Sequence, residues 1–258
     1  MRTLKLTVAY DGTNYVGWQR QLNGVSIQQV LEEAFAPLNQ GVAPTMAGAS
    51  RTDAGAHALG QVVSVNTELD LSTTSFLRAL NVRLPFDIRV LSVEDAMPGF
   101  HARFHSVAKS YRYRIVVAPV MSPFDRGFAW HAPEPKQLSL MQEAARQLVG
   151  RHDFASFQAR GAFVRETVRT IHRLDLTQDG DEIRLECEGD GFLRHMVRTI
   201  TGTLAEIGTG LRPVSSMRDI LEARDRRAAG ATAPAQGLTL LAVSYGVRPG
   251  SDEGQTWV

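Results

Sequence analysis

Short segments in which apolar and polar residues alternate recur from one end of the chain to the other. The clearest are residues 4–10 and 110–117. Alternation with a period of two is typical of β-strands that bury one face, so this pattern limits the fold more than any other feature. Strands are also expected at residues 61–65, 88–93, 167–177, 182–187 and 238–245. Because the turn-forming sequence QDGD fills residues 178–181, the strands on either side of it are expected to form a hairpin.

Helices are expected between these strands. Ser26 and Gln29 have the spacing of a capping box and are followed by an apolar stripe, which predicts a helix that starts at Ser26. Other helices are expected at residues 73–81, 138–149, 193–207 and 215–223.

The elements divide into two halves of similar style. We expect an N-terminal half at residues 1–105, a C-terminal half at residues 106–247 and a disordered tail at residues 248–258. The expected fold class is α+β, with two sheet-and-helix halves, mostly antiparallel or mixed sheets, and a central cleft. Clefts between halves of this kind are common ligand sites.

The composition is ordinary for a soluble protein, with 43% hydrophobic residues, 21% charged residues and a net charge of +1. The first residues lack the apolar region of a signal peptide, and no stretch approaches the roughly 20 apolar residues that span a bilayer. We therefore expect a cytoplasmic protein without membrane contacts. The single cysteine, Cys187, excludes an internal disulfide, and the histidines lack metal-ligand spacing, so no metal site is expected.

Arginine dominates the basic residues, because lysine occurs only at Lys5, Lys109 and Lys136 among 28 basic positions. The planar guanidinium group binds phosphate in a fork and stacks on bases, which favours a nucleic-acid partner. A GC-rich genome would produce the same bias. Composition alone therefore leaves both explanations open.

A loop of small residues carries the first candidate site. Residues 48–57 have the sequence GASRTDAGAH, between a strand-like run at 44–49 and a predicted strand. Small residues allow close approach of a ligand, and Arg51 favours the ionised form of Asp53. These physical arguments fit a ligand site, and they also fit a structural turn with a local salt bridge.

The second candidate is residues 100–117, where basic and aromatic side chains are interleaved. No acidic residue occurs between Asp95 and Asp125. This mixture suits single-stranded RNA, which needs cations for phosphates and flat surfaces for bases. A half-exposed strand explains one aromatic face but not the missing acids. The residues concerned are Arg103, Lys109, Arg112 and Arg114, with His101, Phe104, His105, Tyr111 and Tyr113; on a strand, Tyr111 and Tyr113 share one face and Arg112 and Arg114 the other.

Two further basic groups are weaker signals. Arg194 and Arg198 are four residues apart on the expected helix 193–207 and would share the side opposite its apolar stripe. Such a pair is usually a solvated face. The other group could follow a phosphate backbone or lie on a surface strand, and consists of Arg160, Arg165, Arg169 and Arg173.

The loop at residues 48–57 resembles the signature loop of the TruA family of tRNA pseudouridine synthases, which is commonly G-x-x-R-T-D-x-G-V-H. Ala56 stands where valine is usual. Further blocks resemble the family in the same order, from residue 10 to residue 245, so the resemblance covers nearly the whole chain and implies the pseudouridine synthase fold. They are YDGTNYVGWQRQ at 10–21 with SIQ at 26–28, FHARF at 100–104, KSYRY at 109–113, GFLRHMVR at 191–198, and the segment 233–245 that starts APAQGL.

The resemblance implies an isomerase that detaches uracil from ribose, turns it and rejoins it through carbon, without a cofactor or metal. It assigns Asp53 as the nucleophile, and attack on ribose C1′, addition to uracil C6 and assistance of glycal formation all stay open. Arg198 is expected to pair with Asp53. Tyr111 is expected to stack on the target base, with its hydroxyl a candidate for the later proton transfer. The remaining substrate contacts are assigned to Leu238 as an apolar wall, Arg51 beside the flipped nucleotide, and Arg194 and His57.

The family acts on uridines 38, 39 and 40 of the tRNA anticodon stem–loop, so the resemblance implies tRNA as the partner. It also implies a homodimer, in which two subunits of near-zero net charge would form one long basic cleft. The alternatives are a relative that modifies another RNA position and a non-catalytic module that binds or folds tRNA. An Asp-dependent glycosidase fits less well, because such enzymes usually need a second positioned carboxylate and the loop offers none.

Overall fold

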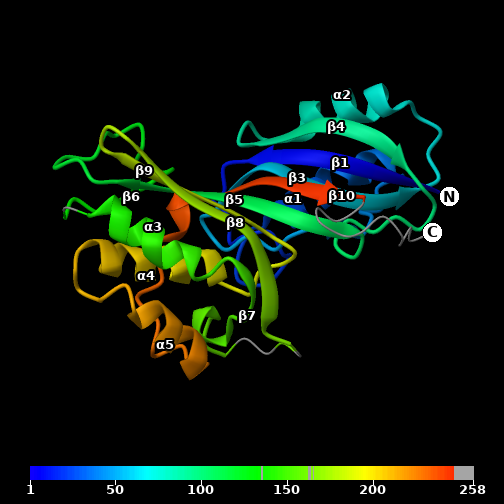
Figure 1. The fold of residues 1–258 in the computed structure, drawn as a ribbon. Coiled ribbons are helices and arrows are strands. Elements are labelled where there is room, and N and C mark those ends of the chain that lie inside the picture. Colours follow the sequence, from blue (N-terminus) through cyan, green and yellow to red (C-terminus); the bar gives the residue numbers. More distant parts are fainter. Residues whose placement is uncertain (135, 162–163, 165, 247–258) are drawn as a thin grey trace. The chain divides into compact units, whose positions relative to one another are not determined.

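The computed structural model describes residues 1–134, 136–161, 164 and 166–246, so Arg165 and the tail expected at 248–258 lie outside the described residues. The chain forms two compact units. The first is Met1–Ala108 with residues 240–246 of the described chain, and the second is Lys109–Thr239. Both contain helices and strands, which confirms the α+β class (Figure 1).

The first unit contains a mixed set of long and short strands. β1 (Arg2–Tyr10) lies between β3 (His57–Thr67) and β4 (Ile88–Ala96) and is antiparallel to both. β2 (Met46–Gly48) pairs with β3, and β10 (Leu238–Tyr245) follows β3 in the strand order. Every predicted strand of this unit is confirmed. β3 begins four residues earlier than predicted because its first residues, HALG, do not alternate.

Two helices belong to the first unit. α1 (Ile27–Phe35) begins after Ser26, whose hydroxyl accepts a hydrogen bond from the Gln29 N–H at 3.2 Å, as the capping signal predicts. The Gln29 side chain donates to Glu33 instead of returning to Ser26. α2 (Thr73–Arg83) packs against β4 (Figure 1). The rings of Phe35 and Phe76 stack at 5.6 Å between the two helices.

The second unit is built on an antiparallel sheet with the order β5-β9-β8-β7. β5 (Ser106–Val116) pairs with β9 (Glu182–Gly189), which forms the predicted hairpin with β8 (Val168–Asp179). Two short strands were not expected, because neither is long enough to show alternation. They are β6 (Trp130–His131), parallel to β5, and β7 (Gly150–Asp153), antiparallel to β8.

The helices of the second unit are α3 (Leu138–Arg146), α4 (Met196–Gly208) and α5 (Ser216–Ala223). α3 packs against β8 and α4 (Figure 1). α4 begins three residues later than predicted, because His195 has a left-handed backbone with φ of 64°. Arg194 therefore lies in a turn, and the prediction that it shares a helix face with Arg198 is wrong. Short 3₁₀ turns complete the described elements at Ala36–Leu38, Ala155–Phe157 and Ala235–Gly237.

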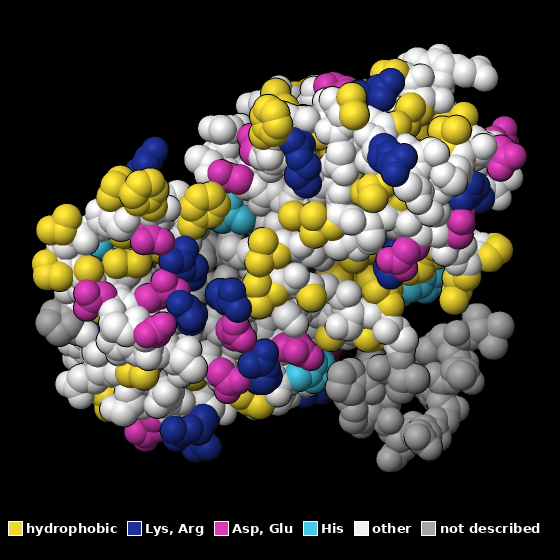
Figure 2. All heavy atoms as spheres, turned by 90° about the horizontal axis from the view of Figure 1, so that it is seen from above, with side chains coloured by type: hydrophobic (Ala, Val, Ile, Leu, Met, Phe, Trp, Pro, Cys, Tyr) yellow, Lys and Arg dark blue, Asp and Glu magenta, His cyan; other side chains and the backbone are white. Residues whose placement is uncertain are grey.

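Charges of both signs are mixed on the surface. On the face drawn in Figure 2, Lys and Arg side chains are interspersed with Asp and Glu side chains, in keeping with the net charge of +1. Within the described part of the chain, every helix is too short or too polar to cross a membrane.

Candidate active site

Asp53 lies in the loop that connects β2 to β3 in the first unit, and its side chain is half-buried. The residues around it differ in exposure. Thr52 and Ala56 are buried, whereas Arg51 is exposed. The Ala56 N–H donates to the Asp53 carbonyl at 3.1 Å, which closes a tight turn directly after Asp53. The loop thus fixes the backbone of Asp53 and leaves Arg51 accessible.

The N-terminal block, residues 10–21, begins at the last residue of β1. It holds this loop on both sides of Asp53. Before Asp53, the Thr52 hydroxyl lies 2.8 Å from the Tyr10 hydroxyl, and the Thr52 carbonyl accepts from the Trp18 N–H at 3.1 Å. After Asp53, the Gly55 N–H donates to the Tyr15 carbonyl at 3.3 Å. The N-terminal block therefore buries and orders the loop.

Two glycines of that block make the close approach feasible. A Cβ on Gly12 would overlap the backbone carbonyl of Ala56. Gly17 has φ of +99° and lies against Thr52, where a Cβ would be 2.7 Å from the carbonyl oxygen. Both positions need glycine for a physical reason, since backbone groups of the loop occupy the space of a side chain.

Gln61 and His57 support the loop from β3. The fully buried Gln61 amide accepts from the Ser50 N–H at 3.1 Å and donates to the Ser50 carbonyl at 2.7 Å, which fixes the residue before Arg51. His57 is only 3% exposed. Its Nδ1 accepts from the Gly12 N–H at 3.1 Å; Asp11 Oδ1 also lies 3.1 Å from Nδ1, a contact that becomes an ion pair only when the ring is protonated.

In the second unit, β5 separates two chemically different faces as predicted. Tyr111 and Tyr113 are buried, whereas Arg112 and Arg114 are half-exposed on the other face. The Tyr111 ring meets the Phe192 ring edge-on at 5.1 Å. This contact fixes the ring plane of Tyr111 in the second unit.

Arg198 and Tyr113 hold the segment that leads to Leu238. Arg198 Nε donates to the Ala233 carbonyl at 2.8 Å, and the Ala233 N–H donates to the Arg198 carbonyl at 3.1 Å. Burial raises the pKa of the Tyr113 hydroxyl, so it stays protonated and donates to the Pro234 carbonyl at 2.6 Å. Leu238 follows this segment and is buried.

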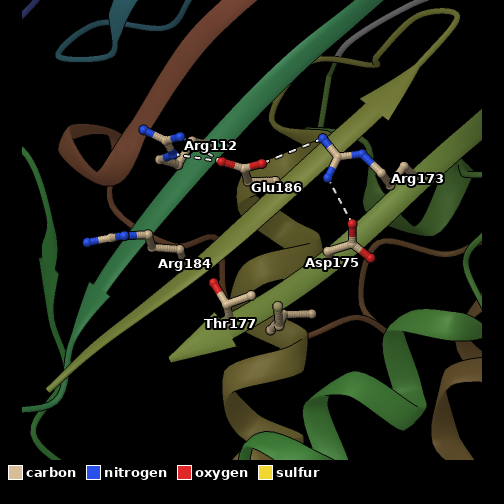
Figure 3. A pocket seen from close by; sticks show the side chains of 7 residues that line it. Arg112, Arg173, Asp175, Thr177, Arg184 and Glu186 are labelled. Carbon is tan, nitrogen blue, oxygen red and sulfur yellow. Dashed lines mark hydrogen bonds and ion pairs between the residues drawn. The ribbon is translucent and has the colours of Figure 1, made fainter. Parts of the chain in front are cut away.

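Arg112 and Arg114 of β5 find on β9 the acidic partners that their own segment lacks. Arg112 pairs with Glu186 at 2.7 Å, and Arg173 of β8 lies 3.5 Å from the same carboxylate and 2.8 Å from Asp175 (Figure 3). These side chains line a cavity of about 380 Å³. The arginines of β5 are therefore already neutralised within the sheet.

Arg114, the second of these β5 arginines, forms two ion pairs. Arg114 contacts Glu182 at 2.7 Å and Asp125 at 2.8 Å. The hydrogen bond from Arg114 lowers the pKa of Glu182 to about 2. Arg114 thus stabilises the sheet as an ion-pair partner.

The site residues predicted from the sequence lie in both units. Asp53, Arg51 and His57 lie on one loop and its following strand in the first unit. The others belong to the second unit, where Arg194 is exposed in the turn before α4. Supporting residues that the sequence reasoning missed are Thr52, Gln61, Phe192, Pro234 and, in its hydrogen-bonding role, Tyr113.

Sequence comparisons show the family to which the chain belongs. The profile of a family described as tRNA pseudouridine synthase matches residues 6–105 and 144–246, so the chain belongs to the tRNA pseudouridine synthase family. A relative from Pelobacter propionicus, named tRNA pseudouridine synthase A, is 45% identical over 95% of this chain and 100% of its own length. Relatives with the same name from Syntrophotalea carbinolica and Geobacter sulfurreducens are 44% and 43% identical over 95% of this chain, and the matches cover 97% and 100% of their lengths.

Proposed function

We propose that this tRNA pseudouridine synthase converts uridine to pseudouridine at positions 38, 39 and 40 of the anticodon stem–loop, with Asp53 as the nucleophile. The observation that supports Asp53 most directly is its loop. Thr52 before it and Gly55 after it are both hydrogen-bonded to the N-terminal block. A reacting carboxylate gains from such fixed geometry, because orientation is then established before substrate binds.

The reaction breaks the bond between ribose C1′ and uracil N1 and forms one between C1′ and C5. The proton on C5 is lost and N1 gains a proton, so substrate and product are isomers. Asp53, the proposed nucleophile, acts on the nucleotide and is regenerated by the end of the reaction. Ribose C1′, uracil C6 and glycal formation stay as alternative routes for this step.

The remaining residues act around Asp53. Arg198 pairs with Asp53 and keeps its carboxylate ionised and aimed, since an opposite charge favours the ionised form. Tyr111 stacks on the target base, and its hydroxyl is available for proton transfer. Leu238 forms an apolar wall beside that base. The firm attachment of the segment before Leu238 to Arg198 and Tyr113 supports this assignment, because it gives the wall a fixed position.

The substrate must leave its base stack before Asp53 can reach it. We assign Arg51, which is exposed beside Asp53, to the flipped nucleotide, and Arg194 and His57 to further contacts with RNA. The His57 ring is buried, so a contact with RNA requires that the ring become accessible. The most direct effect of His57 is on the position of Gly12, whose N–H donates a hydrogen bond to the ring. We further propose that two copies form a cytoplasmic homodimer whose combined surface binds one tRNA.

Mapping pseudouridine in an unmodified tRNA after incubation with the purified protein tests the proposed positions. Product confined to positions 38–40 is expected. Product elsewhere would identify a relative with another target. Tight tRNA binding without any pseudouridine would instead favour a non-catalytic module that binds or folds tRNA.

A further inference from the structure

The turn between β4 and β5 presents an aromatic surface to solvent. Phe104 is 73% exposed, and its ring lies 4.2 Å from the His101 ring at an interplanar angle of 34°. The guanidinium carbon of Arg103 lies 5.9 Å from the centre of the Phe104 ring. A single exposed phenylalanine needs no explanation, but a phenylalanine whose ring packs over a second ring beside a cation offers an exposed aromatic face with defined chemistry.

This turn is firmly attached to the first unit through Ala102, which is fully buried. The Ala102 N–H donates to Ser64 Oγ at 3.1 Å, and its carbonyl accepts from the Tyr245 hydroxyl at 2.7 Å. Ala102 also shares a small apolar core with Val62 and Ala49. Because Ala49 is the first residue after β2 in the loop that carries Asp53, the aromatic surface and that loop are anchored to the same core. A surface ordered in advance loses little entropy when a ligand binds.

The chemistry around the rings suits an anionic, flat ligand. Among the described residues, the Arg103 guanidinium has no hydrogen-bond acceptor or carboxylate partner, and no acidic residue occurs at positions 96–124. The histidines use Nδ1 locally. His101 accepts from the Arg103 N–H at 3.1 Å, and His105 accepts from the His101 N–H at 3.0 Å. The Nε2 atoms of the neutral rings therefore carry the protons and serve as donors.

Another exposed phenylalanine of the same unit lacks these properties. Phe86 is 97% exposed and lies 5.0 Å from the Arg89 guanidinium carbon. Arg89, however, donates to the backbone carbonyls of Leu84, Pro85 and Ile88. Phe86 thus provides a matched control whose cation is already engaged.

We propose that Phe104 and His101 form a stacking platform for an unpaired base of the RNA substrate, and that Arg103 contacts an adjacent phosphate. Every base offers a flat face, so such a platform binds single-stranded RNA with little sequence preference. The platform would help to hold the anticodon loop while the target uridine is at the Asp53 loop. This inference rests on the proposed action on tRNA.

The test compares Phe104→Ala, Phe104→Trp and Phe86→Ala with the wild type. For each protein, the Kd for unmodified tRNA and the pseudouridine formation rate at saturating tRNA are measured. Phe104→Ala is expected to raise the Kd by about 5- to 150-fold, the range that loss of one stacked base produces. Phe104→Trp should restore the Kd, and Phe86→Ala should leave it unchanged. The saturating rate should be the same in all four proteins. The additional tryptophan fluorescence of the Phe104→Trp protein should be quenched by a single-stranded oligouridylate.

Wild-type affinity in Phe104→Ala would overturn the platform, as would an equal loss in Phe86→Ala or failure of tryptophan to restore binding. Unfolding temperatures of the variants check that each protein is folded. Failure of the proposed function is distinguishable, because it appears as tRNA binding without pseudouridine in the wild type, whereas the Kd comparison needs no catalysis.

Discussion

Arg198 and Ala233 are joined by two hydrogen bonds of opposite direction. The Arg198 side chain donates to the Ala233 carbonyl, and the Ala233 N–H donates to the Arg198 carbonyl. A residue on α4 therefore orders the segment that leads to Leu238. The same side chain is the proposed ion partner of Asp53, so one arginine would position both the nucleophile and the wall of the base pocket.

We predict that Arg198→Ala lowers turnover more than tRNA affinity. Misplacement of a reacting group by about 1 Å can reduce the rate roughly 100-fold, whereas most contacts with RNA would remain. Single-turnover rates and tRNA Kd values measure the two effects separately. Arg194→Ala is the matched comparison, since Arg194 is exposed in the turn before α4 and should affect mainly the Kd. Equal losses of rate and affinity in Arg198→Ala would argue against its pairing with Asp53.

Tyr111→Phe should separate stacking from hydroxyl chemistry. The ring, which packs edge-on against Phe192, is retained, so the tRNA Kd should stay at its wild-type value. If the hydroxyl transfers a proton, turnover should fall by about 100-fold or more. Tyr111→Leu removes the ring as well and should weaken binding. A fully active Tyr111→Phe enzyme would show that the hydroxyl has no chemical role.

Gly12→Ala should disturb the Asp53 loop although residue 12 is distant from Asp53 in sequence. The added methyl group would overlap the Ala56 carbonyl, and overpacking of this kind typically costs about 1–3 kcal/mol of stability. The free energy of unfolding, measured with denaturant, and the turnover rate should both be lower than in the wild type. Gly191→Ala is the control, because a Cβ there would meet Arg169 only at an ordinary 3.5 Å. Wild-type stability and turnover in Gly12→Ala would contradict the described packing.

Glu182→Gln should reduce stability at neutral pH by about 1 kcal/mol, because it breaks the pairing with Arg114. The folded-state pKa of Glu182, about 2, lies below its ordinary value of 4.5. Its contribution is thus complete above pH 4.5 and is lost as the pH falls toward 2. The difference in unfolding free energy between wild type and Glu182→Gln should shrink across that interval. Glu166→Gln, which alters a longer and more exposed pair with Arg151, should show little difference at any pH.

The sequence predicts the long strands well because one face of each is buried and the alternation records this. It fails where an element is too short to show a period, as in β6 and β7. It also misplaces the start of α4, because the left-handed backbone of His195 interrupts the helix and the apolar periodicity does not record it. Periodicity in the sequence therefore predicts where the long strands form, whereas it does not predict where α4 begins.

The candidate site shows the same division. The resemblance identifies Asp53 and its loop directly from the residues. The supports of the site are not local in sequence: Gln61 of β3 bonds to Ser50 in that loop, and Tyr113 reaches Pro234, in the segment before Leu238, from far away in the sequence. The missing acids of residues 100–117 likewise come from β9, and only strand pairing reveals that Arg112 and Arg114 are neutralised there.

The substitution Asp53→Asn decides whether Asp53 is the nucleophile. Asparagine keeps nearly the same shape but lacks the charge and the nucleophilic carboxylate. Purified wild type and Asp53→Asn are incubated with the same unmodified tRNA, and pseudouridine is mapped after equal times. Product is expected at positions 38–40 with the wild type and none with Asp53→Asn, at similar tRNA affinity. Pseudouridine formation by Asp53→Asn at the wild-type rate would contradict this role of Asp53.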